Sequence, residues 1–329
     1  MSFLVPVPGA QLSRDIADFP EGIVIPVNKP LRWTSADVIR KLKFAAIKHF
    51  GKKNLKVGHA GTLDPLATGI LLVCIGPACR MAQSLQDTDK EYIALMRFGA
   101  TTPSYDLEKP VDRMFPHEHI TEEAVRAALP AFLGEQEQVA PLFSAKSVDG
   151  VRAYELARKL YRSGSGNLDT AALETLHRSR ITISELELLG YLEASFSEEV
   201  DSPETVPPAA HEWEGPIGGR EWGKACFHTG PDDNGRDEDR RSEVSGESAT
   251  SEKSTASSRI HFEDTSALGL PEATIRIACS KGTYIRAFAR DLGEALGSGA
   301  HLAGLIRSRS GSFRLSDALT MDQAMELFR

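Results

Sequence analysis

Hydrophobic positions recur along this chain with two spacings, one typical of strands and one typical of helices. Short apolar or alternating runs predict five strands, at residues 23–27, 69–75, 91–98, 180–189 and 273–279. Apolar side chains three or four residues apart, or capping residues at the start, predict helices at residues 34–50, 121–133, 152–161, 281–296 and 322–328. Because strands and helices follow no regular alternation, the pattern favours an α+β fold over a doubly wound parallel sheet.

One segment breaks this pattern, because residues 228–258 contain almost no large apolar side chain. Such a segment cannot bury enough surface to offset its ordering entropy, so we expect it to be disordered. The short apolar pieces that flank it, residues 222–227 and 259–262, are expected to pair as a hairpin. A regulatory or interaction loop is one interpretation, and we favour the other, a tolerated surface insertion.

The acidity of the chain is concentrated around the same segment. Residues 191–272 hold 19 acidic and 7 basic side chains, and the rest of the chain holds 27 acidic and 31 basic ones. The net charge of −8 therefore hides a mildly basic remainder, which is compatible with a nucleic-acid partner. We divide the chain into one discontinuous folded domain, residues 1–190 and 273–329, and an acidic, partly disordered insertion, residues 191–272.

Composition excludes several other classes of protein. Hydrophobic residues make up 41% of the 329 positions and charged residues 26%, as in ordinary globular proteins. The longest apolar run, residues 70–75, is too short to span a bilayer, and the N-terminus lacks the basic start of a signal peptide. The four cysteines have no zinc-site spacing. We expect a cytoplasmic protein without a metal.

Two segments carry residues suited to catalysis. Residues 58–69 read GHAGTLDPLATG, which matches neither a P-loop nor a dinucleotide-binding motif. On the residues alone, Asp64 is either a catalytic carboxylate or the cap of a structural turn. Residues 279–286 read CSKGTYIR and lie where a strand meets a helix. There, Lys281 and Arg286 either attract an anion or, in the case of Arg286, hold a carboxylate such as Asp64.

A third group is weaker, residue by residue. Tyr92 lies at the head of a predicted strand, where a tyrosine is usually a packing residue, and the basic run at residues 307–314 is most simply a solvated face. Together, a carboxylate, an arginine, two tyrosines and scattered bases suit an enzyme that acts on a flipped nucleotide.

These segments and several others resemble, in order, the motifs of the TruB family of bacterial tRNA pseudouridine-55 synthases. The resemblance covers nearly all of residues 22–190 and 273–315. The matching motifs are residues 28–30 (NKP), 58–69, 90–92 (KEY), 141–146 (PLFSAK), 152–155 (RAYE), 279–286, 291–293 (DLG) and 305–307 (LIR).

The resemblance implies a pseudouridine synthase fold, with a central mixed, largely antiparallel sheet and flanking helices. It implies isomerisation of uridine 55 in the T-arm stem-loop of tRNA, by a monomer that needs no metal, cofactor or obligate protein partner. Carried over by motif position, Asp64 is the catalytic residue, and burial beside Arg286 would keep it ionised. The implied substrate-binding residues are Tyr92, which stacks on the uracil, Arg286, which pairs with Asp64, Tyr284 and Leu305, which line the pocket, His59, which contacts the T-loop, and Lys29 near the site.

The sequence also departs from the family pattern. Many members end in a small RNA-binding domain of the PUA type, and we expect none here, because only about 15 residues follow Phe313, ending in the predicted helix at residues 322–328. Two alternatives to this function are a synthase acting on another structured RNA and a non-catalytic RNA-binding protein that folds tRNA.

Overall fold

The computed structural model describes residues 3–141, 147–148, 151–152, 178–195, 260 and 262–329. A nine-stranded sheet dominates these residues, with the strand order β1-β3-β12-β4-β11-β10-β7 and with β2 and β13 paired to β3 and β12. Its strands are β1 (Ile23–Lys29), β2 (Val57–His59), β3 (Ala67–Ile75), β4 (Lys90–Phe98), β7 (Gly134–Val139), β10 (Arg178–Leu192), β11 (Glu272–Cys279), β12 (Ala300–Ser310) and β13 (Phe313–Arg314). Only the β12–β3 pair is parallel, so the predicted α+β fold with a mixed, largely antiparallel sheet is confirmed.

Helices and short elements complete the fold. The α-helices are α1 (Ser35–Phe50), α2 (Ala82–Gln86), α3 (Glu122–Ala128), α7 (Ile285–Ala295) and α8 (Met321–Glu326). The 3₁₀ turns are η1 (Ile16–Asp18), η2 (Gly76–Met81), η3 (Leu129–Phe132), η4 (Ser266–Leu268) and η5 (Leu315–Asp317). Two small hairpins pair β5 (Ala100–Thr101) with β6 (Arg113–Met114) and β8 (Ser147–Val148) with β9 (Val151–Arg152). None of the helices in these described stretches is long and apolar enough to cross a bilayer.

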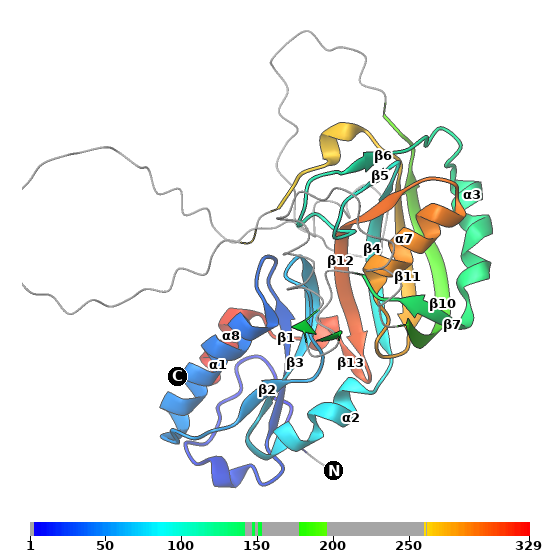
Figure 1. Cartoon of the computed structure of the whole chain (residues 1–329). Helices are drawn as coiled ribbons and strands as arrows, with labels where there is room; N and C mark the ends of the chain where they lie inside the picture. Colours follow the sequence, from blue (N-terminus) through cyan, green and yellow to red (C-terminus); the bar gives the residue numbers. More distant parts are fainter. Residues whose placement is uncertain (1–2, 142–146, 149–150, 153–177, 196–259, 261) are drawn as a thin grey trace, which may run out of the picture.

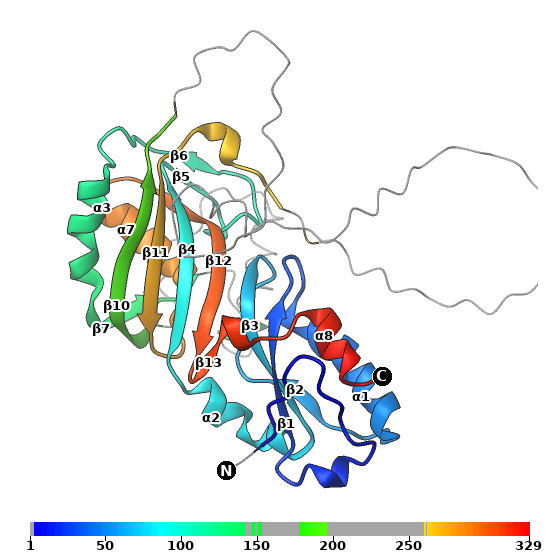
Figure 2. The same ribbon diagram turned by 180° about the vertical axis from the view of Figure 1, so that it is seen from behind.

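The molecule has two halves that meet at β12 (Figures 1 and 2). In one half, α1 and α8 pack against β1 and β3 to form one hydrophobic core. In the other half, α3 and α7 pack against β4, β10 and β11 to form a second core. Tyr92 and Leu305 contact both cores. Residues at the centre of the sheet are therefore held from both sides.

The predicted strands are all present. The helix expected at residues 322–328 is α8, which ends two residues earlier, and two other helices differ more. The helix expected at residues 121–133 ends at Ala128 and continues as η3, because Pro130 has no N–H to donate into an α-helix. The helix expected from residue 281 begins only at Ile285, because Gly282 has a left-handed φ of +82° and Tyr284 is extended. Nearly all of the helix expected at residues 152–161 lies outside the described residues, as do residues 222–227 and 228–258.

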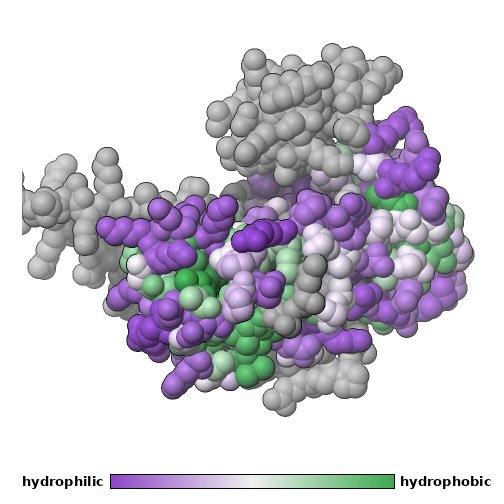
Figure 3. Space-filling view, turned by 90° about the horizontal axis from the view of Figure 1, so that it is seen from below, coloured by the Kyte–Doolittle hydropathy of each residue, from purple (hydrophilic) through white to green (hydrophobic). Residues whose placement is uncertain are grey.

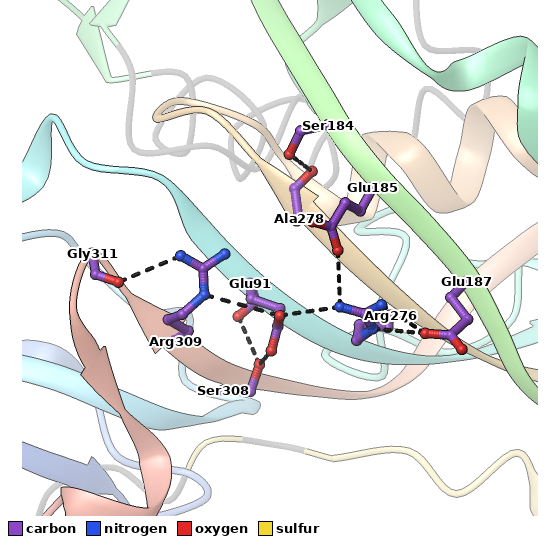
Figure 4. A network of polar contacts seen from close by, with 9 residues as sticks. All are labelled: Glu91, Ser184, Glu185, Glu187, Arg276, Ala278, Ser308, Arg309 and Gly311. Atoms are coloured by element: carbon purple, nitrogen blue, oxygen red, sulfur yellow. Dashed lines mark hydrogen bonds and ion pairs between the residues drawn. The ribbon is translucent and has the colours of Figure 1, made fainter.

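A polar network fixes the register of four neighbouring strands (Figure 4). Arg276 of β11 lies 3.0 Å from Glu185 and 2.7 Å from Glu187 of β10, and 3.4 Å from Glu91 of β4. Glu91 also accepts a 2.7 Å hydrogen bond from Ser308 of β12. Single exposed ion pairs contribute little, but this network spans all four strands. It holds the neighbours of Tyr92 and Arg307, which are themselves paired across β4 and β12.

One face of the molecule is mostly hydrophilic. Viewed from below, hydrophilic side chains cover most of the face, and small apolar patches interrupt them (Figure 3).

Residues that follow the acidic segment pack on the sheet. Thr265 and Leu270 are buried, and Glu272 forms an ion pair with Arg97 of β4. Arg97 also donates a 2.8 Å hydrogen bond to Thr265 Oγ1, which lies 3.0 Å from His301 Nε2. Residues 262–272 therefore pack on the folded domain, although composition assigned them to the insertion.

The buried His301 makes the stability of this region sensitive to acid. Its Nδ1 lies 3.0 Å from the carbonyl oxygen of Ala100, and burial lowers the pKa of the imidazole from 6.5 to about 4. Because the unfolded chain binds the proton more tightly, His301 lowers the free energy of unfolding as pH falls from 6.5 towards 4.

We expect the protein to lose about 2 kcal/mol of stability from His301 alone between pH 7 and pH 5. Urea unfolding of the wild type and of His301→Gln at both pH values measures this. The variant should show a smaller difference between the two pH values, since glutamine keeps hydrogen-bonding groups and does not titrate. Equal pH dependence in the two proteins would contradict the assignment.

Candidate active site

Asp64 lies in the loop that connects β2 to β3, and buried side chains stabilise this loop by hydrogen bonds to its backbone. Lys29, at the end of β1, is fully buried. Its ammonium group donates to the carbonyl oxygens of Pro30, Trp33 and Pro65, at 2.8, 2.6 and 3.2 Å. Burial lowers the pKa of Lys29 from 10.5 to about 7. Lys29 thus fixes the backbone next to Asp64 and does not face solvent.

Arg307 of β12 holds the other end of the loop. It is 2% exposed and donates to the carbonyl oxygens of Gly61, Thr62 and Ile70, at 3.2, 3.3 and 2.7 Å. The expectation of a solvated basic run is therefore wrong at Arg307. Its side chain lies on the core side of the sheet, with all these donors bonded to the backbone.

A glycine allows the two strands at this point to approach. Gly69 of β3 has a φ of +98°, and a Cβ at this position would lie 2.3 Å from the carbonyl oxygen of Arg307. Any side chain here would push β3 away from β12. Ser35 of α1 adds two bonds to the loop, since its Oγ donates to the carbonyl oxygen of Leu63 and accepts from the Leu63 N–H, at 3.1 and 2.9 Å.

One arginine faces two carboxylates at the centre of the site. Arg286 lies in the first turn of α7, and its Nε is 3.0 Å from Asp64 Oδ2 and 3.6 Å from Asp106 Oδ2. Its Nη1 also donates to the carbonyl oxygen of Ser104 at 3.3 Å. The Arg286 side chain is 6% exposed, and that of Asp64 is 41% exposed. The arginine is therefore the buried partner, and the Asp64 carboxylate is open to a ligand.

Asp106 is the residue that the sequence did not reveal. Its Oδ1 accepts from Ser104 Oγ and from the Glu108 N–H, at 2.6 and 2.9 Å, which leaves Oδ2 facing Arg286. Burial raises the pKa of this carboxyl, and the charge of Arg286 opposes the rise. No motif marks Asp106, because it follows a strand by several loop residues and reaches Arg286 only through the fold.

The exposed side of Asp64 opens into a pocket. Three charged side chains and a mainly apolar wall form its lining, which includes Leu31, Asp64, Leu66, Asp106, Leu107, Phe262, Arg286, Leu302 and Leu305. Of the residues predicted from the sequence, the structure thus brings Asp64, Arg286 and Leu305 to one pocket. A carboxylate fixed by an arginine beside an apolar wall suits a reaction on a flat, uncharged ring.

The other predicted residues lie around these three. Tyr92 is paired across the sheet with Arg307, and burial raises the pKa of its hydroxyl against the charge of that arginine. The phenol is therefore protonated at neutral pH. Tyr284 is the N-cap residue of α7, and Gln138 bonds both its N–H and its carbonyl oxygen. His59 lies in β2, where burial, and then the charge of Arg307, lower the pKa of its imidazole.

The helix start does not present free cations to an anion. Lys281 forms a 2.8 Å ion pair with Asp87, and Arg286 faces Asp64 and Asp106. Of the two interpretations of residues 279–286, the structure therefore shows the one in which Arg286 holds a carboxylate. Among the described residues, no three His, Cys, Asp or Glu side chains are grouped as metal ligands.

Comparisons with known proteins give a consistent result. The chain matches the model of the TruB family pseudouridylate synthase N-terminal domain over residues 48–203, and that of the tRNA pseudouridylate synthase B C-terminal domain over residues 286–328. It is 38% identical over 309 residues to tRNA pseudouridine synthase B of Phocaeicola vulgatus, covering 94% of each chain. It is 33% identical over 304 residues to the protein of the same name from Deinococcus radiodurans, covering 92% of this chain and 78% of that one.

A solved structure also resembles this chain. It is a chain in the crystal structure of a Cbf5-Nop10-Gar1 complex, with a TM-score of 0.48 and 21% identity. The match covers 93% of this chain and 54% of that one, so this chain spans about half the length of that protein. The two tRNA pseudouridine synthases B named above are closer to this chain in length. The two family models match this chain in the order N-terminal domain, then C-terminal domain. The chain thus belongs to the TruB family of pseudouridylate synthases.

Proposed function

We propose that this protein isomerises uridine 55 in the T-arm of tRNA to pseudouridine, with Asp64 as the catalytic residue. Family membership supports the reaction, and its relatives are named for activity on tRNA. The observation that carries the assignment of Asp64 is its position at the pocket, 3.0 Å from the buried Arg286 and still 41% exposed.

The reaction defines what the site must do. The bond between C1′ of the ribose and N1 of the uracil breaks, the uracil turns while bound, and C5 bonds to C1′. The proton on C5 leaves and N1 gains a proton, so atoms and electrons balance without any co-substrate. A carboxylate contributes as a nucleophile at C1′ or as a base at C2′, and both roles require an unprotonated oxygen that reaches the sugar.

We assign these needs to groups that lie around the pocket. The buried Arg286 side chain orients the Asp64 carboxylate, and Asp106 forms a second ion pair with Arg286. Leu305 lines the pocket, and Tyr92 contacts the same two hydrophobic cores as Leu305. We propose that the uracil stacks on the Tyr92 ring. Proton removal from C5 needs a base near the turned ring. We propose that Tyr92 assists this step through its hydroxyl, which is protonated at neutral pH and is not itself that base.

The remaining parts of the proposal follow from the family resemblance. We propose a monomer that acts in the cytoplasm on the T-arm stem-loop, without a metal, cofactor or obligate protein partner. Lys29 supports the backbone of the Asp64 loop from inside the protein. We propose that His59, on the half-buried strand β2, contacts the T-loop of the tRNA.

Release of tritium from tRNA labelled at C5 of uridine tests the proposal directly. We expect release from an unmodified tRNA transcript, and none from the same transcript with cytidine at position 55. Release that persists with the cytidine transcript would show that another uridine is the substrate. Tight binding of both transcripts without any release would instead favour a non-catalytic RNA-binding protein.

A further inference from the structure

Arg32 has an unusual backbone conformation beside the active-site loop. Its φ is +63°, in the left-handed region that favours glycine, and its N–H donates a 2.9 Å hydrogen bond to the carbonyl oxygen of Pro65. Pro65 directly follows Asp64, so Arg32 is fixed next to the catalytic loop. Backbone strain of this kind is concentrated at functional sites, which motivates a functional interpretation of Arg32.

The side chain of Arg32 has an aromatic partner from a distant part of the chain. Its guanidinium carbon lies 5.0 Å from the centre of the Phe262 ring, as in a cation–π contact. Phe262 lines the pocket with Asp64 and packs near Leu107, and the N–H of Glu263 bonds the carbonyl oxygen of Leu107 at 2.9 Å. The segment that carries Phe262 is thus fixed at the pocket wall.

Arg32 also differs from the other cations around this loop. Lys29 and Arg307 are buried and bonded to carbonyl oxygens, and Arg286 faces two carboxylates. Arg32 is exposed, and no carboxylate of the described residues lies within ion-pair distance of it. A polyanion that approaches the two aspartates of the pocket needs a cation at the entrance to offset their charge.

We propose that Arg32 and Phe262 together form an additional RNA-binding contact at the entrance of the pocket. Arg32 binds a backbone phosphate next to the nucleotide that enters the pocket, and the Phe262 ring holds the guanidinium plane in place. The inference rests on the proposed function, since it requires an RNA substrate. Neither residue belongs to the motifs that carry the family resemblance.

Arg32→Gly is a sharp test, because glycine adopts the left-handed conformation without strain. The variant should melt at the same temperature as the parent or higher, while its affinity for tRNA falls about tenfold. The slope of log affinity against log salt should become shallower by about one, as expected for the loss of one phosphate contact. Filter binding of unmodified tRNA, in an Asp64→Asn background so that the RNA stays unmodified, measures both quantities.

Arg126→Ala is the matched control, since it removes one exposed positive charge on α3, a helix that contributes no residue to the pocket lining. Its affinity should change by less than about twofold and its salt slope should not change. Phe262→Leu keeps an apolar side chain and removes the ring. It should weaken binding when Arg32 is present and have little further effect in Arg32→Gly.

Two results would overturn the inference. Unchanged affinity and salt slope in Arg32→Gly would show that Arg32 does not contact the RNA. Additive effects of Arg32→Gly and Phe262→Leu would show that the two residues do not act as a pair. Failure of the proposed function is distinguishable from both, because it appears as a wild-type protein that releases no tritium from tRNA.

Discussion

Asp64→Asn is expected to reduce the turnover of tRNA at least about 1,000-fold, with little effect on binding. Asparagine has the size of aspartate and its oxygen still accepts a hydrogen bond from Arg286, so the loop should keep its conformation. Its amide oxygen is a poor nucleophile towards C1′ and a poor base towards C2′. Binding relies on phosphate contacts and stacking elsewhere, and the loss of one negative charge beside RNA should not weaken it.

Single-turnover tritium release and equilibrium tRNA binding separate the two effects. Asp317→Asn is a suitable control, because Asp317 is exposed in η5, far along the chain from the Asp64 loop, and accepts a hydrogen bond from its neighbour Ser316. It should retain full turnover. If Asp64→Asn keeps more than a few per cent of wild-type turnover, Asp64 is not the group that reacts with the ribose.

The fold was largely predictable because its strands follow simple hydrophobic patterns. The strand at residues 69–75 is a continuous apolar run, and that at residues 273–279 alternates. β12 was missed, because the charged and hydroxyl side chains at its end, residues 307–310, resemble a solvated basic run. Arg307 belongs inside only because backbone carbonyl oxygens of the Asp64 loop accept its donors, and these carbonyls carry no signal in the sequence.

Site residues that lie within a motif, such as Asp64 and Arg286, could be predicted from the sequence. A residue that reaches the site only through a partner distant in the sequence could not. The pairing of Arg286 with Asp64 was one of two alternatives, which the sequence alone left open. Asp106 was not found, because nothing in a short loop marks a carboxylate that faces an arginine 180 residues later. The expectation that Asp64 is buried also differs from the structure, since the desolvated member of the pair is Arg286.

Because Arg286 contacts two aspartates, we expect turnover to fall even when a substitution at this position keeps the positive charge. Arg286 is 5% exposed and reaches Asp64, Asp106 and the carbonyl oxygen of Ser104 at once. A lysine ammonium is a compact charge on a flexible stem and cannot reproduce the planar fork. Arg286→Lys should therefore leave the Asp64 carboxylate poorly oriented, although the positive charge remains.

We expect turnover to fall about 100-fold in Arg286→Lys and further in Arg286→Gln, because small misplacements of a reacting group are costly. Affinity for tRNA should change by less than about threefold in the lysine variant, since Arg286 faces carboxylates and not solvent. Arg290→Lys, one turn later on α7, is the control for the helix itself and should have little effect on turnover. Wild-type turnover in Arg286→Lys would show that charge alone suffices, and a parallel loss of affinity and turnover would show that Arg286 contacts the RNA instead of positioning Asp64.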